Sequence, residues 1–381
     1  MFDDPFPALR PPAASLFHGI AFLLVLAAYP DRQCSLTIRK PYTRSMGGSS
    51  RHESVQLAIA VLWAAMFAML SVGCGLERAT GNAMGTTYAI QADCPGSLPR
   101  DRIDAELTRL DALMSTYDPH SELSRFNREP VGEALRVSSE LVDVVEAAFA
   151  VSEQTLGAFD VTVAPLVALW GFGADAAQRS PGDGEVAQVL RLVDYRRVAH
   201  SRNPPTLEKL RPATLDLSGI AKGFAVDRVA GLLDDARCGS YLIEFGGEIR
   251  ARATAPGGGP WRVGVESPSG PDYLTTLLLE TDALATSGDY RQYRESDGVR
   301  VSHVIDPRTG YPVDHRLASV TVVAETAMMA DAYATAMLVM GGAKARRVAG
   351  EMNLAALFIV RVDGGFETFH SEAMAAYLES G

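Results

Sequence analysis

The 381-residue chain has few cysteines and no excess of positive charge. Its four cysteines, Cys34, Cys74, Cys94 and Cys238, include no pair at CxxC spacing, and no histidine completes a zinc-binding pattern near them. A structural zinc site is therefore not expected, whereas disulfide bonds are left open. The formal net charge of -11 argues against a nucleic-acid partner, because such binding needs clustered Lys and Arg. An anionic substrate would need a metal ion or a few well-placed cations.

The sequence also lacks internal repeats, low-complexity tracts and the P-loop motif GxxxxGK[ST]. With 47% hydrophobic and 21% charged residues, its composition is that of an ordinary globular protein. No long linker divides residues 84–378, so we expect one globular domain there. Strand-like segments occur in hairpin-like groups with helical segments inserted between them. This order predicts an α+β fold with a mixed, largely antiparallel sheet.

Residues 1–73 are predicted to be a targeting region. Residues 55–70 form an uncharged apolar run of about 16 residues, which is short for a membrane span of about 20 residues but typical of a signal-peptide core. Small residues then precede Cys74, as in the lipobox at which bacterial lipoproteins are cleaved and acylated. A start at Met46 would give a signal peptide of normal length, which suggests that residues 1–45 result from a mis-called start or are a dispensable extension.

The alternative to a lipoprotein is an uncleaved amino-terminal membrane anchor. Both interpretations attach the protein to a membrane outside the cytoplasm, which predicts the periplasmic side of a bacterial inner membrane. In either case residues 74–83 are expected to be a short linker that leads into the globular domain.

Residues 326–340 are almost wholly apolar, and Thr326 can cap a helix that Gly341 ends. Asp331 and Thr335 interrupt this segment, and their i, i+4 spacing puts both on one helical face. A buried, unpaired carboxylate is costly, so Asp331 should have a partner. A carboxylate with a hydroxyl suits magnesium. Alternatively, Asp331 faces solvent or pairs with an arginine, and Thr335 bonds to its own helix.

The segment DLSGIAKGFAVD, residues 216–227, predicts a strand end, a turn of small residues and a helix with Lys222 in its first turn. Free backbone N–H groups at a helix start favour anions, and the lysine adds positive charge, which would suit a pyrophosphate. The alternative is a tight turn with a surface lysine.

A third segment, SHVIDPRTG at residues 302–310, combines His303 with the turn residues Asp306, Pro307 and Gly310. A histidine near phosphates can act as an acid, a base or an orienting group, although a lone histidine can equally be structural. Residues 84–88, 114–117 and 159–173 place Met, Tyr and Trp beside Gly. Such segments can wall a flat aromatic ligand, or they can belong to the core.

Eight segments follow one another in a familiar order: MGTTY, STYDPHSELSRFN, FDVTVAPLVALWGFG, DLSGIAKGFAVD, EFGGEIRARA, ATSGDYRQY, SHVIDPRTG and ADAYATAMLVMG. Together they resemble the successive blocks of the ApbE family of FAD:protein FMN transferases, over about residues 84–342. The resemblance implies that residues 84–378 are a magnesium-dependent, FAD-binding flavin transferase domain. Such an enzyme cleaves the pyrophosphate of FAD, attaches FMN through a phosphoester to a Ser or Thr of a target flavoprotein, and releases AMP.

The resemblance also assigns roles to individual positions. It implies a metal site of the Asp331 and Thr335 side chains and the backbone oxygen of Gly219, where glycine keeps the carbonyl although the family often has Ser, Thr or Ala. It implies nucleotide contacts for Asp216 and Lys222, and a catalytic role for His303, with Asp331 as the alternative group to orient the attacking hydroxyl. Residues expected to line the FAD site are Met84, Tyr117, Ala158, Phe159, Asp160 and Ile305.

Three functions remain in competition at this point. The first is the transferase, acting on an exported redox-complex subunit or FMN-binding domain. The second is an FAD pyrophosphatase, in which water replaces the acceptor hydroxyl. The third is a flavin-binding lipoprotein without activity, which the presence of Asp331, Thr335 and His303 together disfavours.

Overall fold

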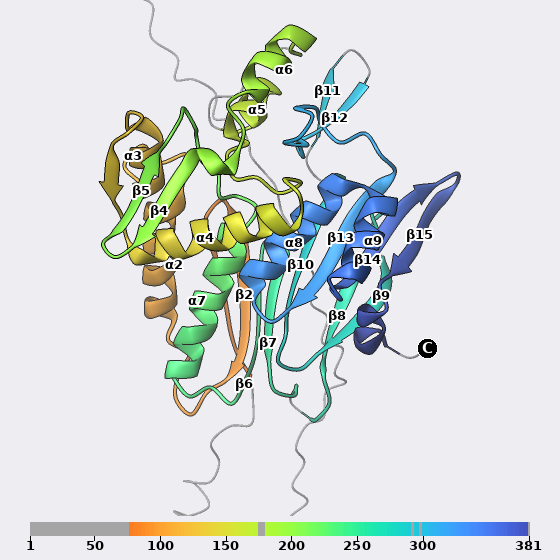
Figure 1. Ribbon diagram of the computed structural model, residues 1–381. Helices are drawn as coiled ribbons and strands as arrows, with labels where there is room; N and C mark the ends of the chain where they lie inside the picture. The colour runs from red at the N-terminus through yellow and green to blue at the C-terminus, as the bar shows by residue number, and fades with distance from the viewer. Residues whose placement is uncertain are drawn as a thin grey trace, which may run out of the picture.

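An eight-stranded antiparallel sheet forms the centre of the molecule (Figure 1). The computed structural model describes residues 76–173, 180–255, 257–270, 272–290, 293–296 and 299–379, so the predicted targeting region and Cys74 lie outside the described residues. The strand order is β1-β2-β6-β7-β10-β13-β14-β15, and each neighbouring pair is antiparallel. The strands are β1 (Glu77–Ala83), β2 (Thr86–Asp93), β6 (Ser240–Phe245), β7 (Glu248–Arg252), β10 (Ala283–Gly288), β13 (Leu317–Ala324), β14 (Ala355–Val362) and β15 (Gly365–His370).

Both faces of this sheet are covered, because apolar side chains alternate between them along each strand. In β14, Phe358 packs beneath helix α8 (Ala327–Met340), whereas Leu357 and Ile359 pack with Trp261 on the other face. Helices α7 (Ala221–Asp235) and α8 therefore lie on one face, and the hairpin of β8 (Trp261–Glu266) and β9 (Tyr273–Leu279) lies on the other (Figure 1). The α+β prediction is confirmed.

A smaller sheet, β3-β5-β4, lies beside the main one with helices α2, α3 and α4 (Figure 1). Helices α5 and α6 and the hairpin β11-β12 stand at one end of the molecule, and α9 follows α8. The bounds are α2 (Arg100–Met114), α3 (Glu122–Arg128), α4 (Ser139–Gln154), α5 (Ala164–Leu169), α6 (Asp183–Leu190), α9 (Gly342–Glu351), β3 (Ala134–Arg136), β4 (Val198–Arg202), β5 (Pro205–Lys209), β11 (Tyr293–Ser296) and β12 (Val299–Ser302).

Two local predictions are wrong. Most of the segment expected to be a linker forms β1, because the turn at Met84 and Gly85, with φ of 47° and 76°, folds it back onto β2. The sequence also suggests one interrupted strand across Gly246 and Gly247. Both glycines have positive φ, which reverses the chain and makes β6 and β7 a hairpin.

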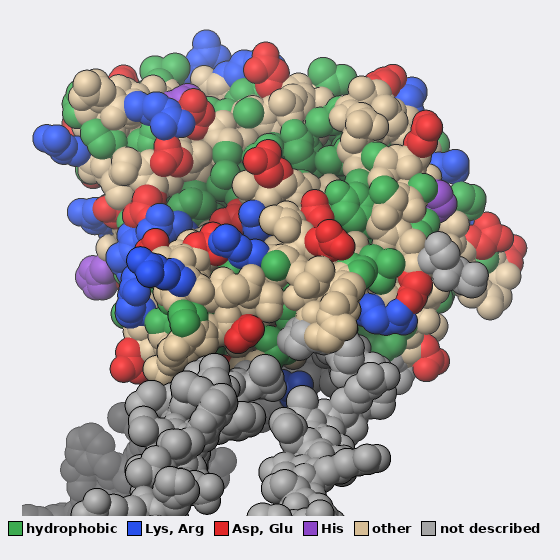
Figure 2. Space-filling model, turned by 90° about the horizontal axis from the view of Figure 1, so that it is seen from below, with side chains coloured by type: hydrophobic (Ala, Val, Ile, Leu, Met, Phe, Trp, Pro, Cys, Tyr) green, Lys and Arg blue, Asp and Glu red, His purple; other side chains and the backbone are tan. Residues whose placement is uncertain are grey.

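The surface mixes charges of both signs. Figure 2 shows one face of the molecule, on which Lys and Arg side chains lie beside Asp and Glu side chains. Exposed ion pairs include Arg102 with Asp235 at 3.8 Å. Such pairs typically contribute about 0–1 kcal/mol each, so stability depends mainly on the buried layers described above. Within the described residues, no helix is both long and apolar enough to cross a membrane.

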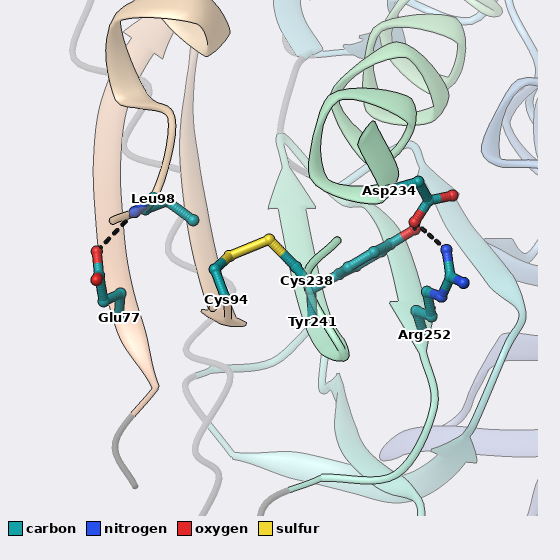
Figure 3. The surroundings of a disulfide bond; sticks show 7 residues. All are labelled: Glu77, Cys94, Leu98, Asp234, Cys238, Tyr241 and Arg252. Carbon is teal, nitrogen blue, oxygen red and sulfur yellow. Dashed lines mark hydrogen bonds and ion pairs between the residues drawn. A yellow bond between two sulfur atoms is a disulfide. The ribbon is translucent and has the colours of Figure 1, made fainter. Parts of the chain in front are cut away.

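One disulfide bond joins Cys94 and Cys238, which are 144 residues apart in sequence (Figure 3). Cys94 follows β2, and Cys238 lies between the end of α7 and the start of β6. Next to the bond, the N–H of Gly239 donates a hydrogen bond of 2.7 Å to the carbonyl of Asp93. The disulfide therefore fastens the end of the β2–β6 ladder to the end of helix α7, whose opposite end carries the candidate site.

Candidate active site

The site is built where the first turn of α7 meets the middle of α8. Thr326 caps α8 by accepting a hydrogen bond of 3.3 Å from the N–H of Met329, as the sequence predicts. The two helices touch at Gly223, where an added Cβ would lie 2.2 Å from the carbonyl oxygen of Ala327. This close approach allows the N–H of Gly223 to donate a 3.1 Å hydrogen bond to Oδ2 of Asp331, which is only 2% exposed.

Thr335, one turn further along α8, faces the turn that precedes α7. A Cβ added to Gly219 in that turn would lie 3.4 Å from the Thr335 hydroxyl oxygen and 3.1 Å from the ring of Phe159. The same hydroxyl lies 3.1 Å from Oγ of Ser287 on β10. The structure thus places Gly219 beside Thr335, and Asp331 lies one turn before Thr335 on the same helix.

Lys222 stands between two buried carboxylates. Its Nζ lies 3.0 Å from Oε1 of Glu248, the first residue of β7, and 3.5 Å from Oδ2 of Asp331. The other carboxylate oxygen of Glu248, Oε2, is buried and has no hydrogen-bond partner among the described residues. The arrangement is a buried cluster of one ammonium and two carboxylates.

Burial dominates the electrostatics of this cluster. It raises the pKa of Glu248, whereas the Lys222 ammonium opposes this shift by stabilising the charged carboxylate. Burial likewise raises the pKa of Asp331, although Lys222 and the Gly223 N–H stabilise its charged form. For Lys222, burial lowers the pKa, but the two carboxylates outweigh burial and the net shift is upward. A nearby cation therefore stabilises the charged form of each carboxylate in the cluster.

The donors at this place suit magnesium. They are a carboxylate, a hydroxyl and a backbone carbonyl, all of them oxygen ligands of the kind that hard cations prefer. No group of three or more His, Cys, Asp or Glu side chains placed to hold a metal occurs in the described part of the chain. Magnesium commonly takes one or two carboxylates and completes its coordination with water and substrate phosphates, so a site with one carboxylate fits it.

The predicted nucleotide-contact residue Asp216 lies on the extended segment that leads into the same turn. Its Oδ1 accepts a hydrogen bond of 2.9 Å from the N–H of Ser218, next to Gly219. Tyr117 is 72% exposed, and partial desolvation together with the nearby negative charge of Asp216 raises its pKa. Tyr117 and Asp216 therefore lie close to each other beside the turn.

The three adjacent residues predicted to line the flavin site have different environments. Phe159 contacts Gly219, as described above, and Ala158 is buried in the apolar cluster formed on α8. The carboxylate of Asp160 instead holds its own loop: Oδ1 accepts from the N–H and hydroxyl of Thr162, and Oδ2 accepts from the N–H of Tyr195. Asp160 thus shapes the wall of the site through the loop.

His303 lies between β12 and an isolated bridge that pairs Ile305 with Pro312. Its ring meets that of Phe172 edge to face, with centroids 6.3 Å apart. Val304 packs in the same apolar cluster as Ala158, and Ile305 is buried in the neighbouring cluster. Residues 303–305 thus form a short irregular segment that holds the His303 ring against Phe172.

Met84 occupies the β1–β2 turn and packs partly buried against the core. The nearby Thr86 side chain lies against the β6–β7 turn, where a Cβ added to Gly246 would come within 2.8 Å of it. The turn that carries Met84 is therefore next to the turn that precedes Glu248.

Two residues of the site, Glu248 and Ser287, are absent from the sequence-based assignment. Glu248 carries a usable signal, since it is a carboxylate directly after Gly246 and Gly247 at the start of an apolar strand. Ser287 carries none, because a serine in a strand has no distinctive pattern.

The chain is similar to known proteins over most of its length. The family model described as "ApbE family" matches residues 84–358. The "FAD:protein FMN transferase" of Haemophilus influenzae is 40% identical over 315 residues, which is 79% of this chain and 91% of that protein. The protein of the same name from Vibrio cholerae is 39% identical over 331 residues, 83% of this chain and 98% of its own length.

Solved structures give the same result. The apo form of the Pseudomonas stutzeri flavinyl transferase ApbE has a TM-score of 0.74 and 35% identity, covering 80% of this chain and 98% of that one. The flavin transferase ApbE from Vibrio cholerae has a TM-score of 0.73 and 38% identity, covering 80% and 99%. The chain belongs to the ApbE family.

Proposed function

We propose that this protein is a magnesium-dependent FAD:protein FMN transferase. The observation that carries the proposal is the meeting of Asp331, Thr335 and Gly219 at the first turn of α7, next to Phe159. The family membership and the names of relatives 34–40% identical to it support the same activity. FAD is the substrate, and the acceptor is a Ser or Thr hydroxyl of a separate flavoprotein.

In this proposal Asp331, Thr335 and the Gly219 carbonyl hold the magnesium ion, which neutralises charge on the pyrophosphate when bound. Tyr117, Ala158, Phe159 and Ile305 line the flavin, while Asp216 and the first turn of α7 face the nucleotide. The positive end of the α7 dipole, which lies at that turn, favours the phosphates. Positioning and electrostatic stabilisation supply most of the rate enhancement in such transfers.

The reaction exchanges the phosphoanhydride bond of FAD for a phosphoester bond to the acceptor. The acceptor hydroxyl oxygen attacks the phosphorus on the FMN side, the bond from that phosphorus to the bridging oxygen breaks, and AMP leaves with the bridging oxygen. The hydroxyl proton goes to a base, because a neutral hydroxyl is a weak nucleophile. We assign this proton transfer to His303.

The test is the fate of FMN. Residues 76–381, incubated with FAD, MgCl2 and a purified FMN-binding domain as acceptor, should give covalent in-gel flavin fluorescence and a stoichiometric amount of AMP. An acceptor with its target Thr changed to Ala is the control and should stay dark. Free FMN and AMP with several untouched acceptors would instead identify a pyrophosphatase, in which water takes the place of the hydroxyl.

We further propose that the enzyme works on the periplasmic side of a bacterial inner membrane, anchored by lipid at Cys74. The apolar run at 55–70 and the small residues before Cys74 support export. The Cys94–Cys238 disulfide supports it independently, because disulfides persist in oxidising compartments. An extracytoplasmic redox subunit benefits from a covalently held flavin, which cannot diffuse away.

Export predicts a specific mature terminus. In the native host, mass spectrometry should find an acylated Cys74 as the first residue, and a non-reduced digest should contain the Cys94–Cys238 cross-linked peptide. Cys74→Ala should accumulate as uncleaved precursor in the membrane. An intact segment through Gly73 in the native protein would favour the uncleaved anchor over the lipoprotein.

A further inference from the structure

The cluster at the start of α7 contains a buried carboxylate to which the proposed reaction assigns no role. Glu248 is 2% exposed, and its Oε1 lies 3.0 Å from Nζ of Lys222. It comes from the central sheet, while Lys222 comes from α7 and Asp331 from α8. Three separate elements thus meet at one ammonium group.

Lys222 is shared unequally between its two carboxylates. Its Nζ is closer to Glu248, at 3.0 Å, than to Asp331, at 3.5 Å. Asp331 also accepts a hydrogen bond from the N–H of Gly223, so it has a partner besides the lysine. Glu248 Oε2, in contrast, is buried without a hydrogen-bond partner among the described residues.

These contacts matter for a metal at Asp331. A divalent cation bound to Asp331 would stand close to the Lys222 ammonium, and the two like charges would repel each other in a buried place. If Lys222 had Asp331 as its sole counter-ion, the lysine and the metal would compete for one carboxylate. Glu248 offers the lysine a second carboxylate at hydrogen-bonding distance.

We propose that Glu248 is a positioning residue that holds Lys222 off the metal ligand Asp331 and so makes Asp331 available to magnesium. Glu248 acts through Lys222, and it touches neither the metal nor the flavin in this assignment. The inference rests on the proposed magnesium site. According to this inference, Glu248 on the β6–β7 hairpin controls the magnesium affinity of that site through its contact with Lys222.

The proposal predicts that Glu248→Gln weakens magnesium binding about 10-fold or more, within the 10–100-fold range typical of residues that support metal ligands. The measurement is calorimetric titration of the purified full-length protein with MgCl2, with the magnesium-dependent rise in Tm as a second readout. Glu248→Asp, which keeps the charge on a shorter side chain, should recover part of the affinity.

A double-variant comparison separates this role from simple structural support. In a Lys222→Met background no ammonium competes for Asp331, so adding Glu248→Gln should change magnesium affinity by less than about 2-fold. Glu244→Gln is the matched control, because it removes another buried carboxylate from the same hairpin, one that accepts a hydrogen bond from the N–H of Gly247. It should have a much smaller effect than Glu248→Gln.

The outcomes are distinguishable. If wild type binds magnesium in an Asp331-dependent way and Glu248→Gln binds it equally well, the positioning role is wrong while the metal site stands. An equal loss in the single variant and in the Lys222→Met background would also overturn it, since the effect would not pass through the lysine. If magnesium binding to wild type is insensitive to Asp331→Asn, the metal site itself is wrong, and the inference with it.

Discussion

Asp331→Ala is expected to abolish FAD cleavage, lowering the rate by more than about 100-fold, the upper end of what supporting residues around a metal cost. The side chain is the single carboxylate among the proposed ligands, so its removal takes away the charge that attracts the cation. EDTA should stop wild-type activity, and added magnesium should restore it. The measurement is AMP release from FAD at saturating acceptor.

Two further variants show whether the loss of activity comes from the lost charge or from lost packing. Asp331→Asn keeps the size of the side chain and an oxygen to accept from the Gly223 N–H, so it should fold normally and still lose activity. Thr335→Val removes a hydroxyl at nearly constant volume and should cost less than Asp331→Ala but more than Thr335→Ser. Full activity of Asp331→Ala in EDTA would refute the assignment of the site.

Helix α8, which carries the proposed metal ligands, could be predicted because its determinants are local. Thr326 caps it, Gly341 ends it, and the i, i+4 spacing of Asp331 and Thr335 fixes their common face whatever the rest of the chain does. Lys222 in the first turn of α7 could be predicted for the same reason. The partners of these residues come from distant parts of the chain, and their proximity depends on the sheet order.

Glu248 illustrates what the sequence alone could not predict. Glu248 precedes Asp331 by more than eighty residues in the sequence. It contacts Lys222 because β7 packs against α7 in the folded protein. The disulfide is similar, since nothing in the spacing of Cys94 and Cys238 indicates that β2 and β6 are neighbours.

The local sequence pattern was also misleading at a place where a side chain, and not a neighbouring strand, forms hydrogen bonds with the backbone. Residues 214–217 look like a strand and are extended, but the Asn127 side chain takes the place of a neighbouring strand. Its Oδ1 accepts from the N–H of Leu215 at 2.8 Å, and its Nδ2 donates to the Leu215 carbonyl at 2.9 Å. Asn127 itself lies in α3, within a polar segment that reads as a loop, where Ser121 caps the helix by accepting from the Ser124 N–H.

The second large effect on activity is expected from substitution of His303, to which the proton transfer is assigned. His303→Ala should keep FAD binding and lower FMN transfer by about 100- to 10,000-fold, the usual contribution of a general acid or base. Binding should persist because the ring packs against Phe172, and the substitution leaves Ala158 and Phe159, which are proposed to line the flavin, unchanged. Equilibrium FAD binding and single-turnover transfer, measured on the same preparation, separate the two steps.

The pH dependence of the rate distinguishes a base from a residue that only shapes the pocket. If His303 accepts the hydroxyl proton, wild-type transfer should fall on the acidic side as the imidazole becomes protonated, and this limb should disappear in His303→Ala. Phe172→Leu is the matched control: it removes the edge-to-face contact but keeps the imidazole, so it should retain the acidic limb with a loss of at most about 10-fold. Retention of transfer within about 3-fold in His303→Ala would move the proton transfer to the other candidate. In that case Asp331 both holds the metal and orients the attacking hydroxyl.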